Sequence, residues 1–163
     1  MITTAFVKIW GETIGAVAWD ENSGTASFEY EPKFIAQSID LAPLKMPINN
    51  ATNRIFSFPE LRNTKTFKGL PGLLADVLPD DYGNQLINTW LAQNGRPENS
   101  MNPVEMLCFI GTRGMGALEF EPSQLKVTKR AFDIEVDELI QMSQKMLTKR
   151  DAFETNLAKD EQQ

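Results

Sequence analysis

AFVKIWGETIGAVAWDENSGTASFEYE, residues 5–31, contains three strand-like segments in succession. Residues 5–10 and 13–19 are rich in β-branched and aromatic side chains, and a glycine between them marks a tight turn. Residues 25–31 follow the loop DENSG and alternate apolar with polar side chains, which is the period of a half-buried strand. The sequence therefore predicts an antiparallel β-meander. Two of its aromatic residues are expected in the core, Trp10 and Phe28.

Helical spacing replaces this alternation from residue 71 onward. Four prolines between positions 32 and 59 favour short extended pieces and turns in the intervening region, with a short helix at its start. Further on, apolar residues recur every three to four positions, and Asn102-Pro103 is typical of a helix start. The expected helices lie at 33–37, 71–79, 82–94, 103–110 and 137–147, and two more strands lie at 117–121 and 132–136.

These segments predict an α+β fold: an antiparallel meander or partly closed small barrel, then a helical segment, a further strand and a C-terminal helix. The length of 163 residues suits one domain or slightly more. The net charge of −6 is concentrated in residues 71–125, which carry seven acidic and two basic residues. This distribution disfavours direct nucleic-acid binding, which relies on neutralising phosphates with basic side chains.

The sequence has no histidine and a single cysteine, Cys108. Catalytic triads and zinc sites that need histidine are therefore excluded, as is a disulfide within the chain. Cys108 lies in an apolar run and is expected to be buried. Because no apolar stretch approaches the roughly 20 residues that span a bilayer, and the N-terminus lacks a signal-peptide pattern, we expect a cytoplasmic protein without membrane contact.

Two patterns resemble chemical sites but have structural interpretations. The glycine-rich loop 111–116 follows a helix and precedes a strand, which is the reverse of the order in dinucleotide and Walker-type sites. Close packing and turn geometry explain it better. Asp76, Asp80 and Asp81 form the densest acidic patch, where a metal or acid–base pair is conceivable, but Asp80 and Asp81 are adjacent before a helix and are explained by helix capping. We therefore predict no catalytic, cofactor-binding or metal-binding residue.

LPGLLADVLPDDYG at 70–83 and GMGALEFEP at 114–122 together resemble two motifs of HipA-family proteins. The similarity extends over about residues 4–150. It implies the N-terminal region of bacterial serine/threonine kinase toxins of type II toxin–antitoxin modules, held inactive by a DNA-binding antitoxin. On this resemblance, residues 1–125 are the β-rich subdomain with helices, and residues 126–163 connect it toward a kinase lobe. The family's ATP loop and catalytic aspartates match nothing here, so Mg-ATP is expected only for a full-length kinase.

Three functions remain open at this point. The first is a non-catalytic scaffold that packs on a HipA-like kinase core and contacts the antitoxin. The second is a standalone accessory protein, similar to an antitoxin, that binds and neutralises a separate HipA-like kinase chain. The third is an unrelated enzyme, which the missing acid–base groups disfavour. Six residues are the candidates for a partner interface: Asp76, Asp80, Asp81, Tyr82, Arg113 and Met115.

Overall fold

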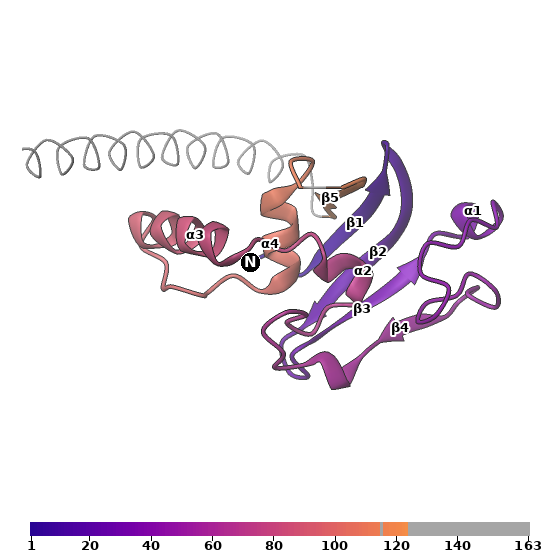
Figure 1. The fold of residues 1–163 in the computed structure, drawn as a ribbon, viewed down its shortest axis with the longest axis horizontal. Helices are drawn as coiled ribbons and strands as arrows, with labels where there is room; N and C mark the ends of the chain where they lie inside the picture. Colours follow the sequence, from indigo (N-terminus) through magenta and orange to yellow (C-terminus); the bar gives the residue numbers. More distant parts are fainter. Residues whose placement is uncertain (115, 124–163) are drawn as a thin grey trace, which may run out of the picture.

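The computed structural model describes residues 1–114 and 116–123, which form a five-stranded antiparallel sheet with helices packed on one of its faces (Figure 1). The strands lie in the order β4-β3-β2-β1-β5. Their bounds are Thr4–Ile9 (β1), Glu12–Asp20 (β2), Thr25–Tyr30 (β3), Ile55–Ser57 (β4) and Leu118–Pro122 (β5). The α+β class is confirmed. The sheet is open, with β4 and β5 at its edges, so it is the expected meander and not a barrel.

Helices form near the positions that the sequence predicts. Their bounds are Pro32–Ile35 (α1), Gly72–Ala75 (α2), Asp81–Gln93 (α3) and Pro103–Ile110 (α4), with a 3₁₀ turn at Pro59–Leu61. The predicted helix 71–79 is too long, because the amides of Val77 and Leu78 bond to carbonyls three residues back as the chain tightens ahead of Pro79. The expected strand 132–136 and helix 137–147 lie outside the described residues, as does the predicted 126–163 segment.

The hairpin between β1 and β2 corrects one core prediction. Its two-residue loop is Trp10-Gly11, with φ of 49° and 79°, as in a type I′ turn. Because Trp10 is a turn residue, the alternation of the strand does not extend to it, and 85% of the residue is exposed. The prediction that Trp10 is a core residue is therefore wrong.

The inner face of the sheet carries the main core. Phe28 is fully buried, and its ring packs edge-on against Tyr30 with 4.8 Å between the centroids. A β-carbon on Gly15 of the neighbouring strand would lie 2.6 Å from the Phe28 ring, so only glycine fits beneath it. The prediction that Phe28 is a core residue is confirmed.

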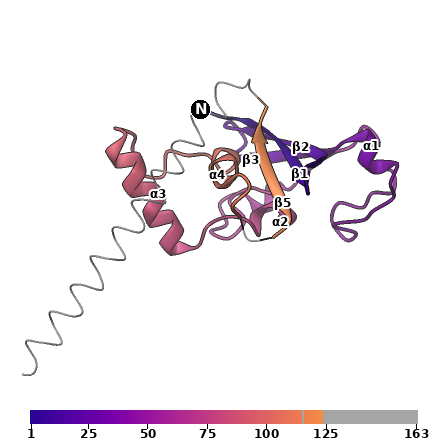
Figure 2. The same cartoon turned by 90° about the horizontal axis from the view of Figure 1, so that it is seen from above.

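Helix α4 lies between the sheet and α3, as both views show (Figures 1 and 2). Its residues 103–109 are all buried, and it contacts β1, β2 and β5. Trp90 of α3 packs against Phe109 of α4 within a second apolar cluster. None of the helices in residues 1–114 and 116–123 has the length and apolar character needed to cross a bilayer.

Polar contacts of buried side chains fix α4 in place. Asn102 accepts a hydrogen bond from the Glu105 amide at 2.8 Å and donates to the Ile2 carbonyl at 2.8 Å. The Glu105 side chain is only 4% exposed, and its carboxylate accepts hydrogen bonds from Nη1 and Nη2 of Arg96, each at 3.1 Å. Such bidentate pairs are geometrically specific, so this one fixes the α3–α4 connection and with it the position of α3.

Candidate functional site

The start of α3 is organised by its own side chains. Asp80 caps the helix, since its carboxylate accepts from the Gly83 amide at 2.8 Å. Asn84 donates to the carbonyls of Pro79 and Asp80 at 3.1 and 2.9 Å. The sequence-based interpretation of this aspartate as a helix cap is confirmed.

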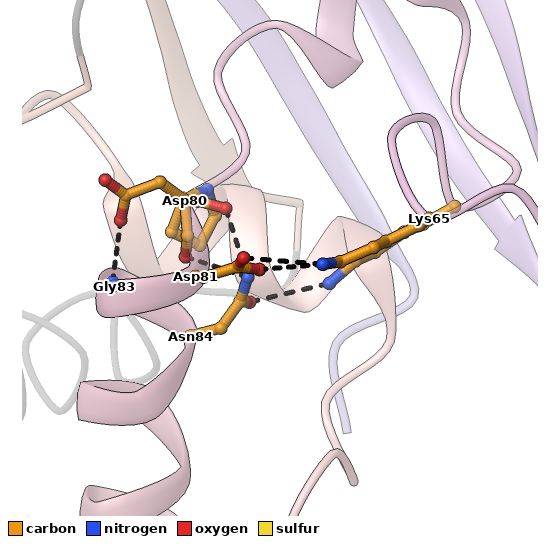
Figure 3. Close-up of polar contacts among 7 residues, drawn as sticks. Lys65, Asp80, Asp81, Gly83 and Asn84 are labelled. Atoms are coloured by element: carbon orange, nitrogen blue, oxygen red, sulfur yellow. Dashed lines mark hydrogen bonds and ion pairs between the residues drawn. The ribbon is translucent and has the colours of Figure 1, made fainter.

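Two lysines from the loop before α2 approach this helix start, and Figure 3 shows one of them, Lys65, beside Asp81. The Lys65 ammonium lies 3.2 Å from the Asp81 carboxylate, and the Lys68 ammonium donates to the side-chain amide oxygen of Asn84 at 3.4 Å. The Lys65 and Asp81 side chains are 84% and 78% exposed, so this pair adds at most about 1 kcal/mol to stability. Burial lowers the pKa of Lys68, with Asp81 acting in the opposite direction.

Between these lysines and α3 lies a cleft of about 690 Å³, which we call the polar cleft. Its lining combines ammonium, carboxylate and amide groups, and comprises Lys65, Thr66, Lys68, Ala75, Asp76, Leu78, Pro79, Asp80, Asp81, Asn84 and Asn99. Asp76 is exposed, and its carboxylate has no hydrogen bond or ion pair within residues 1–114 and 116–123. The polar cleft therefore offers a carboxylate to an incoming donor.

A second depression, of about 330 Å³, adjoins the polar cleft, and we call it the apolar groove. Leu41, Phe58 and Leu73 are among its lining residues, and Asp76 lines both depressions. Leu44 at its margin is 93% exposed. An apolar depression bordered by charged and polar groups has the composition of a protein–protein interface.

Three of the six candidate residues come together in this structure. Asp76, Asp80 and Asp81 line the polar cleft. Tyr82 follows in the first turn of α3, does not line the cleft, and is 47% exposed. The remaining two are Arg113, which is exposed, and Met115, which lies outside the described residues.

The glycine-rich loop packs against the link between α2 and α3. A β-carbon on Gly114 would lie 2.7 Å from Val77 and 3.1 Å from Ile110, so glycine allows a close approach here. This contact places Arg113, the preceding residue, close to the segment that contains Asp76. The loop has the packing role that its order between helix and strand predicts.

Sequence reasoning missed several residues of this surface. Lys65 and Lys68, in the stretch KTFK, lie just before the acidic patch, which is the signal that would have suggested pairing with it. Asn99 comes from the α3–α4 connection and Leu44 from a loop without periodicity, so no local pattern marks either residue. Only the tertiary arrangement places them together.

Neither a metal-binding cluster nor a reactive thiol is found among the described residues. Among the described residues, no three acidic or cysteine side chains are grouped so that they could hold a metal ion. Burial raises the pKa of the Cys108 thiol to about 12, with Glu105 contributing, so the thiolate that nucleophilic chemistry needs is disfavoured. The expected burial of this cysteine is confirmed.

Comparison with known proteins identifies the domain. The family model described as the HipA N-terminal domain matches residues 5–121, which include all five strands except the first residue of β1 and the last residue of β5. No curated protein matches the chain. The matched residues cover most of the chain and include both the polar cleft and the apolar groove. The chain therefore belongs to the family of the HipA N-terminal domain.

Proposed function

We propose that this chain is the non-catalytic interaction region of a HipA-like serine/threonine kinase toxin of a toxin–antitoxin module. In this role it packs on the kinase core, contacts a DNA-binding antitoxin, and acts in the cytoplasm. The chain itself needs no cofactor, and Mg-ATP belongs to the kinase lobe. The family match over residues 5–121 supports the proposal, because the matched domain is the non-catalytic N-terminal one.

One observation carries this proposal: the polar cleft and the apolar groove meet at Asp76. Interfaces combine an apolar centre, which supplies most of the binding free energy, with polar groups that set orientation. Leu44, 93% exposed, would be buried by a partner seated on the groove. The carboxylate of Asp76 would accept a basic side chain of the same partner, in keeping with the acidic charge of residues 71–125.

The test is a calorimetric titration of this chain with a HipA-like kinase core supplied as a separate protein. We expect Leu44→Asp and Asp76→Lys each to weaken binding by about tenfold or more. Neither side chain is buried, so the melting temperature should stay within a few degrees of the unaltered chain. Glu21→Lys, an exposed charge reversal in the β2–β3 loop, is the control and should leave the affinity unchanged. Unaltered affinity in both test variants would place the interface elsewhere.

Charge reversal at Asp81 or Arg113 extends the same test to the sequence-based candidates. Asp81→Lys replaces an exposed carboxylate of the polar cleft, and Arg113→Glu alters the neighbouring loop. Both are expected to weaken kinase or antitoxin binding without changing the melting temperature. If only the Asp81 variant does so, the interface is limited to the cleft.

The alternative function is a separate protein that binds and neutralises a HipA-like kinase. Such a protein has to fold without a kinase lobe, and the described residues bury one apolar cluster beneath the sheet and another between α3 and α4. A kinase assay with and without this chain separates the two functions: a neutralising protein lowers phosphate transfer in proportion to its occupancy. Under both functions, Mg-ATP should leave the melting temperature of this chain unchanged, and a saturable shift would indicate an enzyme.

A further inference from the structure

The face of the sheet opposite the helices is uncovered in the part of the chain that the structure describes, and we call it the outer face. Alternation along the strands places on it Thr4, Phe6, Lys8, Ala16, Ala18, Ser27, Glu29, Ile55, Ser57, Glu119 and Glu121. Phe6 and Ile55 are 41% and 64% exposed there. Antiparallel sheets often leave one face to solvent, but with polar side chains on it.

One row of residues crosses all five strands of this face. The register pairs Ile55 with Glu29, Glu29 with Ala16, Ala16 with Phe6, and Phe6 with Glu121. Directly paired side chains lie about 5 Å apart. Because the central residue is only an alanine, the row is low at its middle and bordered by an aromatic ring on one side and a carboxylate on the other.

A hollow of about 210 Å³ occupies this low point. It is lined by Phe6, Gly15, Ala16, Glu29, Tyr30, Glu31 and Pro32. Two of these residues, Glu29 and Glu31, carry carboxylates, and neither carboxylate has a hydrogen-bonding or ionic partner within residues 1–114 and 116–123. The single lysine of the face, Lys8, is held by Glu121 on the far side of Phe6. The hollow is therefore acidic and has an aromatic wall.

We propose that the outer face docks a basic segment of a protein partner, with an arginine side chain seated in this hollow. A guanidinium stacks on aromatic rings and pairs with carboxylates through its planar donors, so the ring of Phe6 and the carboxylates of Glu29 and Glu31 match its chemistry. The exposed Ile55 on the same row adds apolar contact for the rest of the segment. This docking surface lies on the other side of the sheet from the α2 helix and does not depend on the proposed function.

The test is an NMR titration of the ¹⁵N-labelled chain with a capped peptide, Ser-Arg-Ala-Arg-Ser. Its two arginines lie about 7 Å apart when extended, which matches two carboxylates separated by one residue along a strand. The matched control peptide contains citrulline, which keeps the shape and removes the charge. We expect saturable shifts at the amides of Phe6, Ala16 and Glu29 with the arginine peptide only. Affinity should fall as salt is raised, since exposed charges are screened.

Variants distinguish binding in the hollow from nonspecific attraction of a basic peptide to an acidic chain. Ala16→Leu fills the hollow and should abolish the localised shifts, whereas Ala18→Leu, on the same strand and face but outside the hollow, should retain them. Phe6→Leu and Glu29→Gln should each weaken binding by up to about fivefold. Four outcomes would each overturn the proposal. The shifts could be absent or centred on residues 76–81, the citrulline peptide could bind equally well, or the two alanine variants could have equal effects.

Discussion

Replacing Phe28 by alanine tests the core of the sheet most directly. The side chain is fully buried, and truncation of a buried phenylalanine costs about 3–5 kcal/mol through lost burial and the cavity that remains. Two features place this site in the upper half of that range. The edge-on contact with Tyr30 is lost, which is worth about 1 kcal/mol beyond burial. Gly15, directly beneath the ring, has no side chain that could fill the cavity.

The measurement is the free energy of unfolding from urea denaturation, with a thermal scan beside it. For a chain of this length, a loss of 4 kcal/mol lowers the melting temperature by about 8–16 °C. Trp10→Ala is the control, because this residue is 85% exposed and its substitution should change stability by no more than about 0.5 kcal/mol. Trp10→Asn should be neutral or slightly stabilising, since asparagine before Gly11 suits the type I′ turn.

A loss below about 1 kcal/mol for Phe28→Ala, with an unchanged denaturant slope, would refute the assignment of the inner face. A large loss for Trp10→Ala would refute the account of the hairpin turn instead. Gly15→Ala provides a third measurement: its β-carbon would lie 2.4 Å from the Glu29 carbonyl, so overpacking should cost about 1–3 kcal/mol even though the change is only one methyl group.

Three further predictions concern the polar groups. Arg96→Met leaves the buried Glu105 carboxylate without its partner and should cost about 3 kcal/mol in urea unfolding, more than Glu105→Gln, which removes the buried charge itself. Asp80→Ala should cost about 1 kcal/mol and Asp80→Asn much less, because asparagine also caps helices; equal losses would contradict the capping role. Burial raises the pKa of Tyr30 and of Cys108 to about 12 in the folded chain. The folded state therefore holds these protons more tightly, so stability should be constant below about pH 9 and fall as pH rises from about 9 to 12. The alkaline loss should be smaller in Tyr30→Phe, and an equal loss would show that the tyrosine is not its source.

Local sequence patterns predicted most of the elements. The alternation at 25–31, the pair Asn102-Pro103 and the aspartates before α3 each act within a few residues, and each appears as expected in the structure. The predictions failed where the alternation or the apolar spacing continues in the sequence beyond the end of the strand or helix. Trp10 continued the strand in sequence but lies in the turn, and apolar spacing continued past Ala75 although the chain tightens before Pro79.

The candidate site was only partly predictable for a related reason. Asp76, Asp80 and Asp81 were identified because they lie close together in the sequence. Lys65 and Lys68 were not, because their loop has no period and is placed by distant contacts, such as the bond from the Ala26 amide to the Gly69 carbonyl at 2.9 Å. Loop conformation of this kind is set by the surface on which it packs.

The sequence by itself determined the type of most described elements and most helix starts, since capping, turn chemistry and periodicity are local. Its motifs at 70–83 and 114–122 carry the resemblance to the HipA family. The tertiary structure alone decided which side chains share a surface. The loop that carries Leu44 is anchored by the Tyr30 hydroxyl, which donates to the Met46 carbonyl at 3.0 Å across 16 residues. The register of the strands likewise brings Phe6, Ala16 and Glu29 into one row. Such neighbours are selected by burial and hydrogen bonding between segments far apart in the chain, and no local pattern encodes them.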